Sequence, residues 1–352
     1  MTVLAPTAAG LRSQAAAGVV CVEAGMVLFV VQDGLMKSLL GEFTVWMLIL
    51  TRSIVTVLVL MPTILILGKP HRLFTPLWPL HLARAALFAF GFSLFYAAFP
   101  FMGLAEVTTI FFAAPLMTAL LAAIFLHETI GRHRIGALVA GFVGVLIAMN
   151  PTGEAFSWIA VLPLLCALTY AISQVIARRI GDRETTLTTG LLTIAFGGVL
   201  IVPMGYAVNL FLEIGPGFQH LRWDWQLPAW NQVHLLILLG AVGMVGYMLL
   251  SRAYQIAPAS LIAPFDYTYL PFATAMAYLV WAEVPAVNTL IGMAMIVGGG
   301  IYLGYREIIA TRRMVEPAPT AEAVFVPGSP AGALAHLADT ADDRTTSAEP
   351  PS

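Results

Sequence analysis

Long apolar runs alternate with short polar links along most of the chain. Two clear runs, Ile135 to Met149 and Ala286 to Leu303, approach with their flanks the roughly 20 helical residues needed to cross a hydrocarbon core. Short links favour antiparallel neighbours, and a helix satisfies its backbone hydrogen bonds within itself. The pattern predicts an all-α integral membrane protein of ten transmembrane helices. They cover residues 16–38, 44–67, 80–101, 103–127, 133–149, 155–178, 187–212, 232–253, 259–282 and 286–307.

The composition supports this class and excludes several others. Of the 352 residues, 59% are hydrophobic and 10% charged, too few charges to cover a soluble surface. The net charge of −2 and the scattered basic residues give no nucleic-acid footprint. Cys21 and Cys166 lie in apolar segments without metal-ligand spacing, and neither a phosphate loop nor an H-E-x-x-H motif occurs. We therefore expect no metal, no cofactor and no ATP-driven step.

The basic residues give the predicted helices an orientation. With ten spans and the N-terminus inside, most of them fall on the cytoplasmic side, as the positive-inside rule requires. This set contains Arg12, Lys69, Arg72, Arg132, Arg134, Arg178, Arg179, Arg183, Arg252, Arg306, Arg312, Arg313 and Arg344, against Lys37 and Arg222 outside. We expect a multi-pass protein of the inner membrane with both termini cytoplasmic: residues 1–15 before the first helix, and a disordered tail, 314–352, of Pro, Ala, Glu, Thr and Ser.

The chain repeats itself weakly at an offset of 156 positions. The matching pairs are Ala97 with Ala253, Pro115 with Pro271, Gly136 with Gly292 and Gly144 with Gly300, while Glu128 falls one residue from Glu283. We interpret residues 16–150 and 155–307 as two five-helix repeats. Because each repeat has an odd number of spans, the two have opposite orientations in the membrane, an arrangement typical of secondary transporters.

Several motifs of the first repeat carry a family resemblance. They are Phe95-Tyr96-Ala97-Ala98, Gly103-Leu104-Ala105-Glu106, Ala114-Pro115-Leu116, Leu126-His127-Glu128, Gly141-Phe142-Val143-Gly144-Val145 and Pro151. The second repeat follows more loosely, through Arg252-Ala253, Ala259, Pro271, Glu283 and Gly292. This pattern resembles the EamA module of the drug/metabolite transporter superfamily. The resemblance implies a ten-helix carrier of small organic metabolites with a central cavity between its halves.

Within this superfamily, the chain resembles a subgroup that includes S-adenosylmethionine carriers through three residues, Asp33, Lys37 and Arg52. Asp33 and Arg52 lie roughly 8 to 12 Å from the outer boundary on adjacent helices, where they are able to pair. They form either a structural salt bridge or a site for a charged substrate. Lys37 and Glu106 are shallower, where snorkelling to the boundary is the simpler interpretation.

Glu23 and Asp266 lie roughly 10 Å from the inner boundary without an obvious basic partner at their depth. Desolvation favours the protonated form of such a carboxylate, so both are candidates for proton coupling, with protons as a possible coupling ion. The alternative is a structural ion-pair cluster that includes Arg84.

The remaining candidates are aromatic and amide side chains: Gln32, Phe111, Tyr170, Gln174, Tyr267 and Tyr269. A lone aromatic residue in a span is more often a packing residue. Pro115 and Pro271 predict helix breaks at matching positions of the two halves, which mark a carrier's binding site. Tyr170 and Gln174 share a helix face and form one predicted wall of that site.

These features favour a secondary transporter of a small organic metabolite, such as an amino acid or derivative, a nucleotide-like metabolite or a vitamin. It would work by alternating access around a cavity inside one monomer, with at most weak homo-oligomerisation. A channel or sensor is an alternative. An enzyme embedded in the membrane is a further alternative, but no histidine lies deep in a predicted span.

Overall fold

The structure is a computed structural model that describes residues 8–68, 71, 73–125, 132–150, 158–180, 183–225, 228–257 and 259–313. Within these ranges every regular element is a helix. Several positions used in the sequence interpretation lie outside the ranges: residues 1–7, Lys69, Arg72, Glu128, Pro151 and the 314–352 tail.

The first half contains α1 (Ala8–Leu39), α2 (Val45–Leu67), α3 (Trp78–Ala98), α4 (Leu104–Phe111), α5 (Ala114–Phe125) and α6 (Arg132–Met149). The second half contains η1 (Trp158–Ala160), α7 (Val161–Ile180), α8 (Thr186–Phe211), η3 (Pro216–Leu221), α9 (Trp230–Ile256), α10 (Ala259–Ile262), η4 (Ala263–Thr268), α11 (Tyr269–Trp281) and α12 (Val287–Arg313).

These helices account for the ten predicted spans. In the described part of the chain, seven stretches are long and apolar enough to cross a membrane: α1, α2, α3, α4 with α5, η1 with α7, α8, and α9. Shorter apolar stretches lie in α6 and α12. The segment α10–η4–α11 provides the tenth. The all-helical, ten-span prediction is confirmed.

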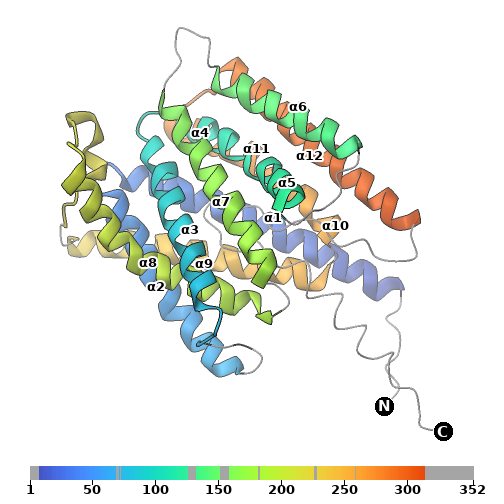
Figure 1. The fold of residues 1–352 in the computed structure, drawn as a ribbon, viewed down its shortest axis with the longest axis horizontal. Coiled ribbons are helices and arrows are strands. Elements are labelled where there is room, and N and C mark those ends of the chain that lie inside the picture. Colours follow the sequence, from blue (N-terminus) through green and yellow to red (C-terminus); the bar gives the residue numbers. More distant parts are fainter. Residues whose placement is uncertain are drawn as a thin grey trace.

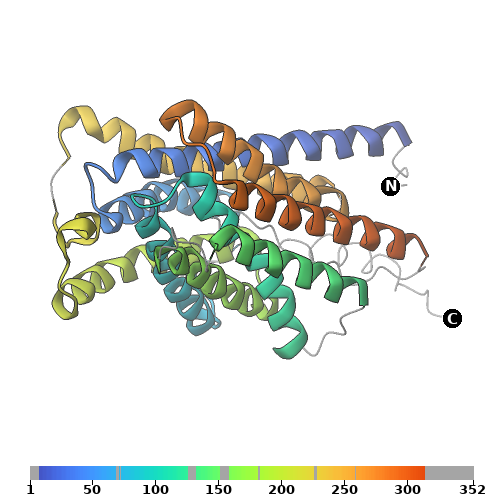
Figure 2. The same ribbon diagram turned by 90° about the horizontal axis from the view of Figure 1, so that it is seen from above.

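The two halves pack on each other through equivalent pairs of helices. The first helix of the first half, α1, packs on the third long helix of the second half, α9, and conversely α3 packs on α7. The last helices of both halves, α6 and α12, lie side by side and run in opposite directions (Figure 1). α1 begins and α12 ends at the same end of the bundle (Figure 2). This reciprocal packing is that of two inverted repeats.

Two glycines lie where the backbones of α6 and α12 approach each other closely. A Cβ atom added to Gly144 would lie 2.9 Å from the carbonyl oxygen of Gly292, and one added to Gly292 would overlap the carbonyl oxygen of Gly144. The backbones therefore meet directly, as small residues allow between membrane helices.

Replacing Gly292 with alanine is expected to destabilise the protein by about 1–3 kcal/mol, because the added methyl group forces the two backbones apart. Thermal unfolding in detergent measures the effect. Gly298→Ala is the control on the same helix, since a Cβ there meets nothing within 4 Å. Equal melting temperatures for the two variants would contradict the close approach.

Both halves interrupt one span at matching places. In the first half, α4 ends at Phe111 and α5 begins at Ala114. In the second half, η4 ends at Thr268 and α11 begins at Tyr269. Pro115 and Pro271 explain the breaks, because a proline removes the hydrogen bond to the carbonyl four residues earlier. The breaks face each other: the Phe112 ring stacks on that of Tyr269 with centroids 5.9 Å apart.

Candidate functional site

A buried carboxylate lies next to the meeting point of the two breaks. Asp33 on α1 is fully buried. Its Oδ2 accepts a hydrogen bond of 2.6 Å from the hydroxyl of Tyr269, and its Oδ1 accepts one of 3.1 Å from the hydroxyl of Tyr96. Gln32 Nε2 approaches Oδ1 at 3.5 Å. Since Tyr96 lies on α3 and Tyr269 on α11, both halves of the protein bind this carboxylate.

Arg52 reaches Asp33 through a tyrosine instead of directly. Its Nη1 donates a hydrogen bond of 2.9 Å to the hydroxyl of Tyr96, which donates onward to Asp33. No direct ion pair joins Asp33 and Arg52, although the structure describes both side chains. The guanidinium also lies 6.0 Å from the Phe88 ring centroid. We call Gln32, Asp33, Arg52, Tyr96 and Tyr269 the Asp33 cluster.

The local sequence explains how these side chains converge. Tyr269 is the first residue of α11, so the break before it sets where its hydroxyl lies. Gln32 fits against α9 because position 243 is glycine, where any Cβ would overlap the Gln32 amide oxygen. The cluster therefore depends on a helix break and on a glycine, both in the second half.

An aromatic group continues from the cluster along α3 and α7. The Phe92 ring lies 6.1 Å from that of Tyr96 and 6.2 Å from that of Tyr170. Phe111, at the end of α4, lies 5.6 Å from Tyr170 and 5.1 Å from Phe95. Most of these contacts have edge-to-face geometry, which aromatic rings favour. The predicted residues Phe111 and Tyr170 thus lie together, one layer away from Asp33.

A cavity of about 590 Å³ opens at the end of the bundle that carries Lys37, which we call the Lys37 end. Lys37 lies one helical turn beyond Asp33 on the same face of α1. The charged side chains that line the cavity are Lys37, Glu106 and Glu283. Phe99 also lines it, with its ring 5.4 Å from that of Tyr96. The bottom of the cavity therefore adjoins the Asp33 cluster.

An ion pair between the two halves crosses this cavity. Lys37 Nζ lies 2.5 Å from Glu283 Oε1 and donates to the carbonyl oxygen of Met102 at 3.2 Å. Glu283 Oε2 accepts a hydrogen bond of 3.1 Å from the backbone N–H of Leu104, at the start of α4. The Lys37 side chain is only 11% exposed, so it does not snorkel to the boundary as the sequence suggested. Glu106 instead accepts from the backbone N–H of Gly103, three residues earlier.

The two candidates for proton coupling lie on a different part of the bundle. Asp266, in η4, is buried, and its Oδ2 accepts a hydrogen bond of 3.0 Å from the hydroxyl of Tyr254. Glu23 is partly buried and accepts one of 3.1 Å from the hydroxyl of Thr268. η4 thus connects both positions. Glu23 precedes Asp33 by ten residues of α1, or roughly 15 Å, so these carboxylates are separate from the Asp33 cluster.

The structure places Tyr267 and Gln174 away from Asp33. The Tyr267 ring packs against Gly300 of α12 and lies 5.8 Å from the Phe112 ring. Gln174 follows Tyr170 by one turn of α7 and is 2% exposed. Neither atom of its amide has a hydrogen-bond partner. Among the predicted binding residues, Gln32 approaches Asp33 directly, Arg52 reaches Asp33 through Tyr96, and Phe111 contacts Tyr170.

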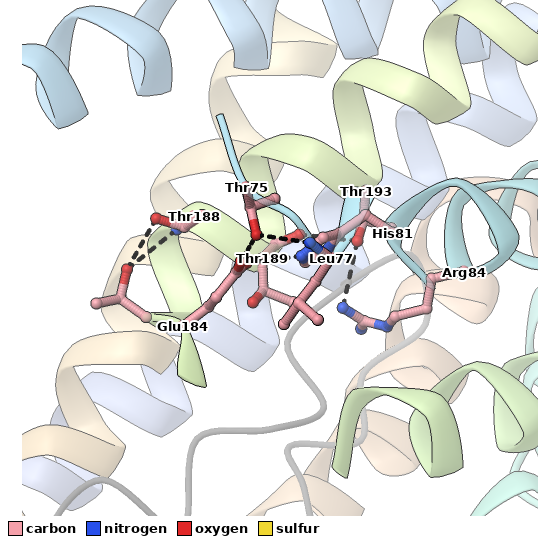
Figure 3. A network of polar contacts seen from close by, with 9 residues as sticks. Thr75, Leu77, His81, Arg84, Glu184, Thr188, Thr189 and Thr193 are labelled. Carbon is pink, nitrogen blue, oxygen red and sulfur yellow. Dashed lines mark hydrogen bonds and ion pairs between the residues drawn. The ribbon is translucent and has the colours of Figure 1, made fainter. Parts of the chain in front are cut away.

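A polar network at the opposite end of the bundle was not predicted from the sequence (Figure 3). His81 Nε2, on α3, lies 2.7 Å from Glu184 Oε2, and the hydroxyl of Thr75 donates to the same carboxylate. One turn further along α3, Arg84 Nη1 donates to the hydroxyl of Thr193 on α8 at 3.2 Å. We call this the Glu184 end. Its members come from α3, from α8 and from the links before these two helices, so spacing along the chain gives no signal for it.

One histidine at the Lys37 end, outside the membrane-spanning helices, has a pKa that is changed by burial. His220, in η3, donates a hydrogen bond of 3.1 Å from Nε2 to the carbonyl oxygen of Ala97. Burial lowers the pKa of His220, and the hydrogen bond to Ala97 opposes this only in part. A neutral imidazole therefore fixes η3 against the end of α3.

Comparison with known proteins identifies the family. The model of the EamA-like transporter family matches residues 16–150 and 157–305, nearly the whole membrane region. The chain belongs to the EamA-like transporter family. The two matched segments confirm the predicted resemblance to a pair of EamA modules. A solved crystal structure with a TM-score of 0.57 covers 86% of this chain and 99% of its own at 17% identity, which supports the fold alone.

Several curated relatives of this EamA-like transporter are named for small molecules. A riboflavin transporter of Rhizobium johnstonii is 29% identical over 66% of this chain and 72% of its own. An S-adenosylmethionine uptake transporter of Rickettsia bellii is 27% identical over 71% of this chain and 80% of its own. A pseudopaline exporter of Pseudomonas aeruginosa is 25% identical, over 62% and 72% respectively. The protein is a multi-pass membrane transporter of small molecules.

Proposed function

We propose that the protein is a secondary active transporter that moves a small organic metabolite through the membrane by alternating access of its two halves. The substrate binds beside the Asp33 cluster. The observation that carries this proposal is the pair of hydrogen bonds that Asp33 accepts, one from Tyr96 in the first half and one from Tyr269 in the second. A movement of one half against the other changes the environment of this buried carboxylate.

The chemistry of the cluster favours a substrate with a cationic or hydrogen-bond-donating group beside a ring. Asp33 supplies the carboxylate, and the rings of Phe111, Phe112 and Tyr170 supply flat apolar surface nearby. Both S-adenosylmethionine and riboflavin, the molecules in the names of the relatives, contain a fused nitrogen heterocycle and hydrogen-bond donors. These two compounds are the first substrates to test.

Counterflow in proteoliposomes tests the proposal. Vesicles containing the purified protein are loaded with unlabelled riboflavin or S-adenosylmethionine, and the uptake of a trace of the same labelled compound is followed. A carrier shows faster uptake when unlabelled substrate is inside, because the loaded binding site returns more quickly. Uptake that is independent of internal substrate indicates a channel and contradicts the proposal.

We propose further that the Lys37 end faces outward, with both termini cytoplasmic in the inner membrane, and that one monomer contains the whole transport path. The positive-inside distribution of basic residues supports this orientation.

Asp266 is proposed to couple proton movement to transport, with Glu23 as a second candidate. Asp266→Asn keeps the size of the side chain and its capacity to accept from Tyr254, but it cannot release a proton. We expect the variant to unfold within about 2 °C of wild type and to lose the dependence of transport on an imposed pH gradient. Transport driven equally well by the gradient in both proteins would remove Asp266 from the mechanism.

A further inference from the structure

A pocket of about 710 Å³ lies at the end of α8, where the chain turns towards η3 and then returns. Residues 209–214 and 222–224 line it. It shares none of these described residues with the cavity lined by Lys37, although both lie at the Lys37 end. Pockets that bind small ligands have volumes of roughly 300–1,000 Å³, so this pocket has the size of a binding site.

The residues around the pocket are those of the depth where acyl chains give way to lipid headgroups. α8 contains 26 residues and is about 39 Å long, so it exceeds a hydrocarbon core of roughly 30 Å. On its last turns Tyr206 and Leu210 are 58% and 63% exposed, an apolar surface suited to acyl chains. The ring centroids of Trp223 and Trp225 lie 5.1 Å apart just beyond, and indole rings favour the headgroup boundary.

Hydrogen bonds fix the wall of the pocket that follows η3. Asn209 Nδ2 donates to the carbonyl oxygen of Leu221 at 2.9 Å, and Asn209 Oδ1 accepts from the backbone N–H of Trp223 at 2.8 Å. The indole Nε1 of Trp46, in the first half, donates to the same carbonyl oxygen of Leu221 at 2.8 Å. Arg222 lies between these two fixed residues, so its backbone is held at the rim of the pocket.

Two opposite charges line the pocket without pairing with each other. Within the described residues, neither Arg222 nor Glu213 takes part in an ion pair, and both are exposed. Asp224 also lines the pocket, but it already has another interaction within the protein. The carbonyl end of α8 adds a partial negative charge beside Glu213, which favours a cationic group. The pocket therefore offers a cation for the anionic group of a ligand and an anion for its cationic group.

We propose that this pocket binds the headgroup of a zwitterionic phospholipid with a primary ammonium group, that is, of phosphatidylethanolamine. Arg222 binds the phosphate, because a planar guanidinium matches two phosphate oxygens with parallel hydrogen bonds. Glu213 accepts hydrogen bonds from the ammonium group. The acyl chains lie against the exposed apolar turns at the end of α8. This site goes beyond the proposed transport function and does not depend on which metabolite is transported.

Other ligands with a phosphate group fit the pocket less well. Phosphatidylglycerol carries the phosphate for Arg222 but has a neutral glycerol in place of the ammonium group, so its net negative charge lies beside the carboxylates of Glu213 and Asp224. A water-soluble phosphate ester has no acyl chains to cover the apolar turns of α8. Both the charges and the apolar surface therefore favour the zwitterionic lipid.

Paired lipids test the site. The purified full chain is freed of lipid, and binding of the first molecule of phosphatidylethanolamine or phosphatidylglycerol, with identical acyl chains, is measured by native mass spectrometry. Wild-type protein is expected to bind phosphatidylethanolamine at least about tenfold more tightly, as charge-assisted hydrogen bonds imply. Glu213→Gln is expected to lose most of this preference, because it removes the partner of the ammonium group. Arg222→Gln is expected to weaken the binding of both lipids by about tenfold, because both contain the phosphate.

Glu42→Gln is the matched control, since Glu42 is an exposed carboxylate at the same end but does not line the pocket, and its preference should stay within about twofold of wild type. Arg222 and Glu213 are exposed, so both variants are expected to melt within about 2 °C of wild type. The deacylated headgroup, glycerophosphoethanolamine, is the third probe. The proposal is overturned if wild type binds both lipids equally, if Glu213→Gln keeps the full preference, or if the deacylated headgroup binds as tightly as the lipid, which would make a water-soluble phosphate ester the ligand.

Discussion

Asp33→Asn is expected to lower the initial rate of transport by about a hundredfold while the protein remains folded. The asparagine side chain has nearly the same shape, so the packing of the fully buried position is kept. The hydroxyls of Tyr96 and Tyr269 lose a charged acceptor, and each hydrogen bond to a charged group contributes about 1.5–3 kcal/mol. A substrate that relies on the same charge loses its partner as well. Initial rates in proteoliposomes measure the loss, with riboflavin and S-adenosylmethionine as substrates.

Asp224→Asn is the matched control for this prediction. Asp224 is exposed in the link that follows η3, so the same chemical change there is expected to leave transport within about twofold of wild type. Melting temperatures of both variants exclude unfolding as the cause. A wild-type rate in Asp33→Asn would contradict the central role of this carboxylate.

The sequence predicted the helices well, because their signal is local. A span of about 20 apolar residues is visible without knowing its neighbours, and the charges of the links orient it. The positions of the helix breaks also have a local cause, since Pro115 and Pro271 each remove one backbone hydrogen bond within their own span. The apolar pattern was therefore sufficient to predict most of the helices of the fold.

The partners of the polar residues were harder to predict, because they come from distant parts of the chain. Asp33 binds Tyr269, 236 positions away, and Lys37 binds Glu283, 246 positions away. The depth of each residue in the membrane, counted along its helix, predicted that Asp33 and Arg52 lie near each other. This depth does not predict that the hydroxyl of Tyr96 lies between them. Tyr96 belongs to the Phe95-Tyr96-Ala97-Ala98 motif of the family resemblance, but the sequence gave it no binding role, since it follows Phe92 and Phe95 in an aromatic-rich helix where packing is the simpler interpretation.

The depth of Lys37 along its helix also led to a wrong prediction, that its side chain snorkels to the membrane boundary. A lysine near a helix end can extend its ammonium to the boundary, and its charged partner does not lie in the first half. The partner comes from the link between α11 and α12. Ala282, in the left-handed conformation with φ of 55°, ends α11 immediately before Glu283. That turn brings Glu283 to Lys37, and no spacing rule connects a turn in one repeat with a lysine in the other.

Breaking the ion pair by Glu283→Gln is expected to open the Lys37 end. The pair joins α1 to the link before α12, and Glu283 also accepts from the first N–H of α4, so one carboxylate connects three segments of both halves. Loss of about 1.5 kcal/mol from the closed state shifts the balance between closed and open states by roughly tenfold. A cysteine placed at Ala277, which lines the cavity but is itself buried, reports the change through its rate of reaction with a water-soluble thiol reagent. Cys21 and Cys166 are first replaced by serine, and labelling is expected to accelerate about tenfold.

Two variants decide whether the ion pair itself is responsible. Glu106→Gln removes the other carboxylate of the cavity, but Glu106 bonds to Gly103 within its own half, so labelling at position 277 is expected to stay at the wild-type rate. The exchanged pair Lys37→Glu with Glu283→Lys restores opposite charges across the halves and is expected to slow the labelling again. If Glu283→Gln and Glu106→Gln accelerate labelling equally, the effect is one of cavity charge, and the Lys37–Glu283 contact does not control access. If only Glu283→Gln does so and the exchanged pair reverses it, an electrostatic contact between the repeats closes the path from the Lys37 end to Asp33.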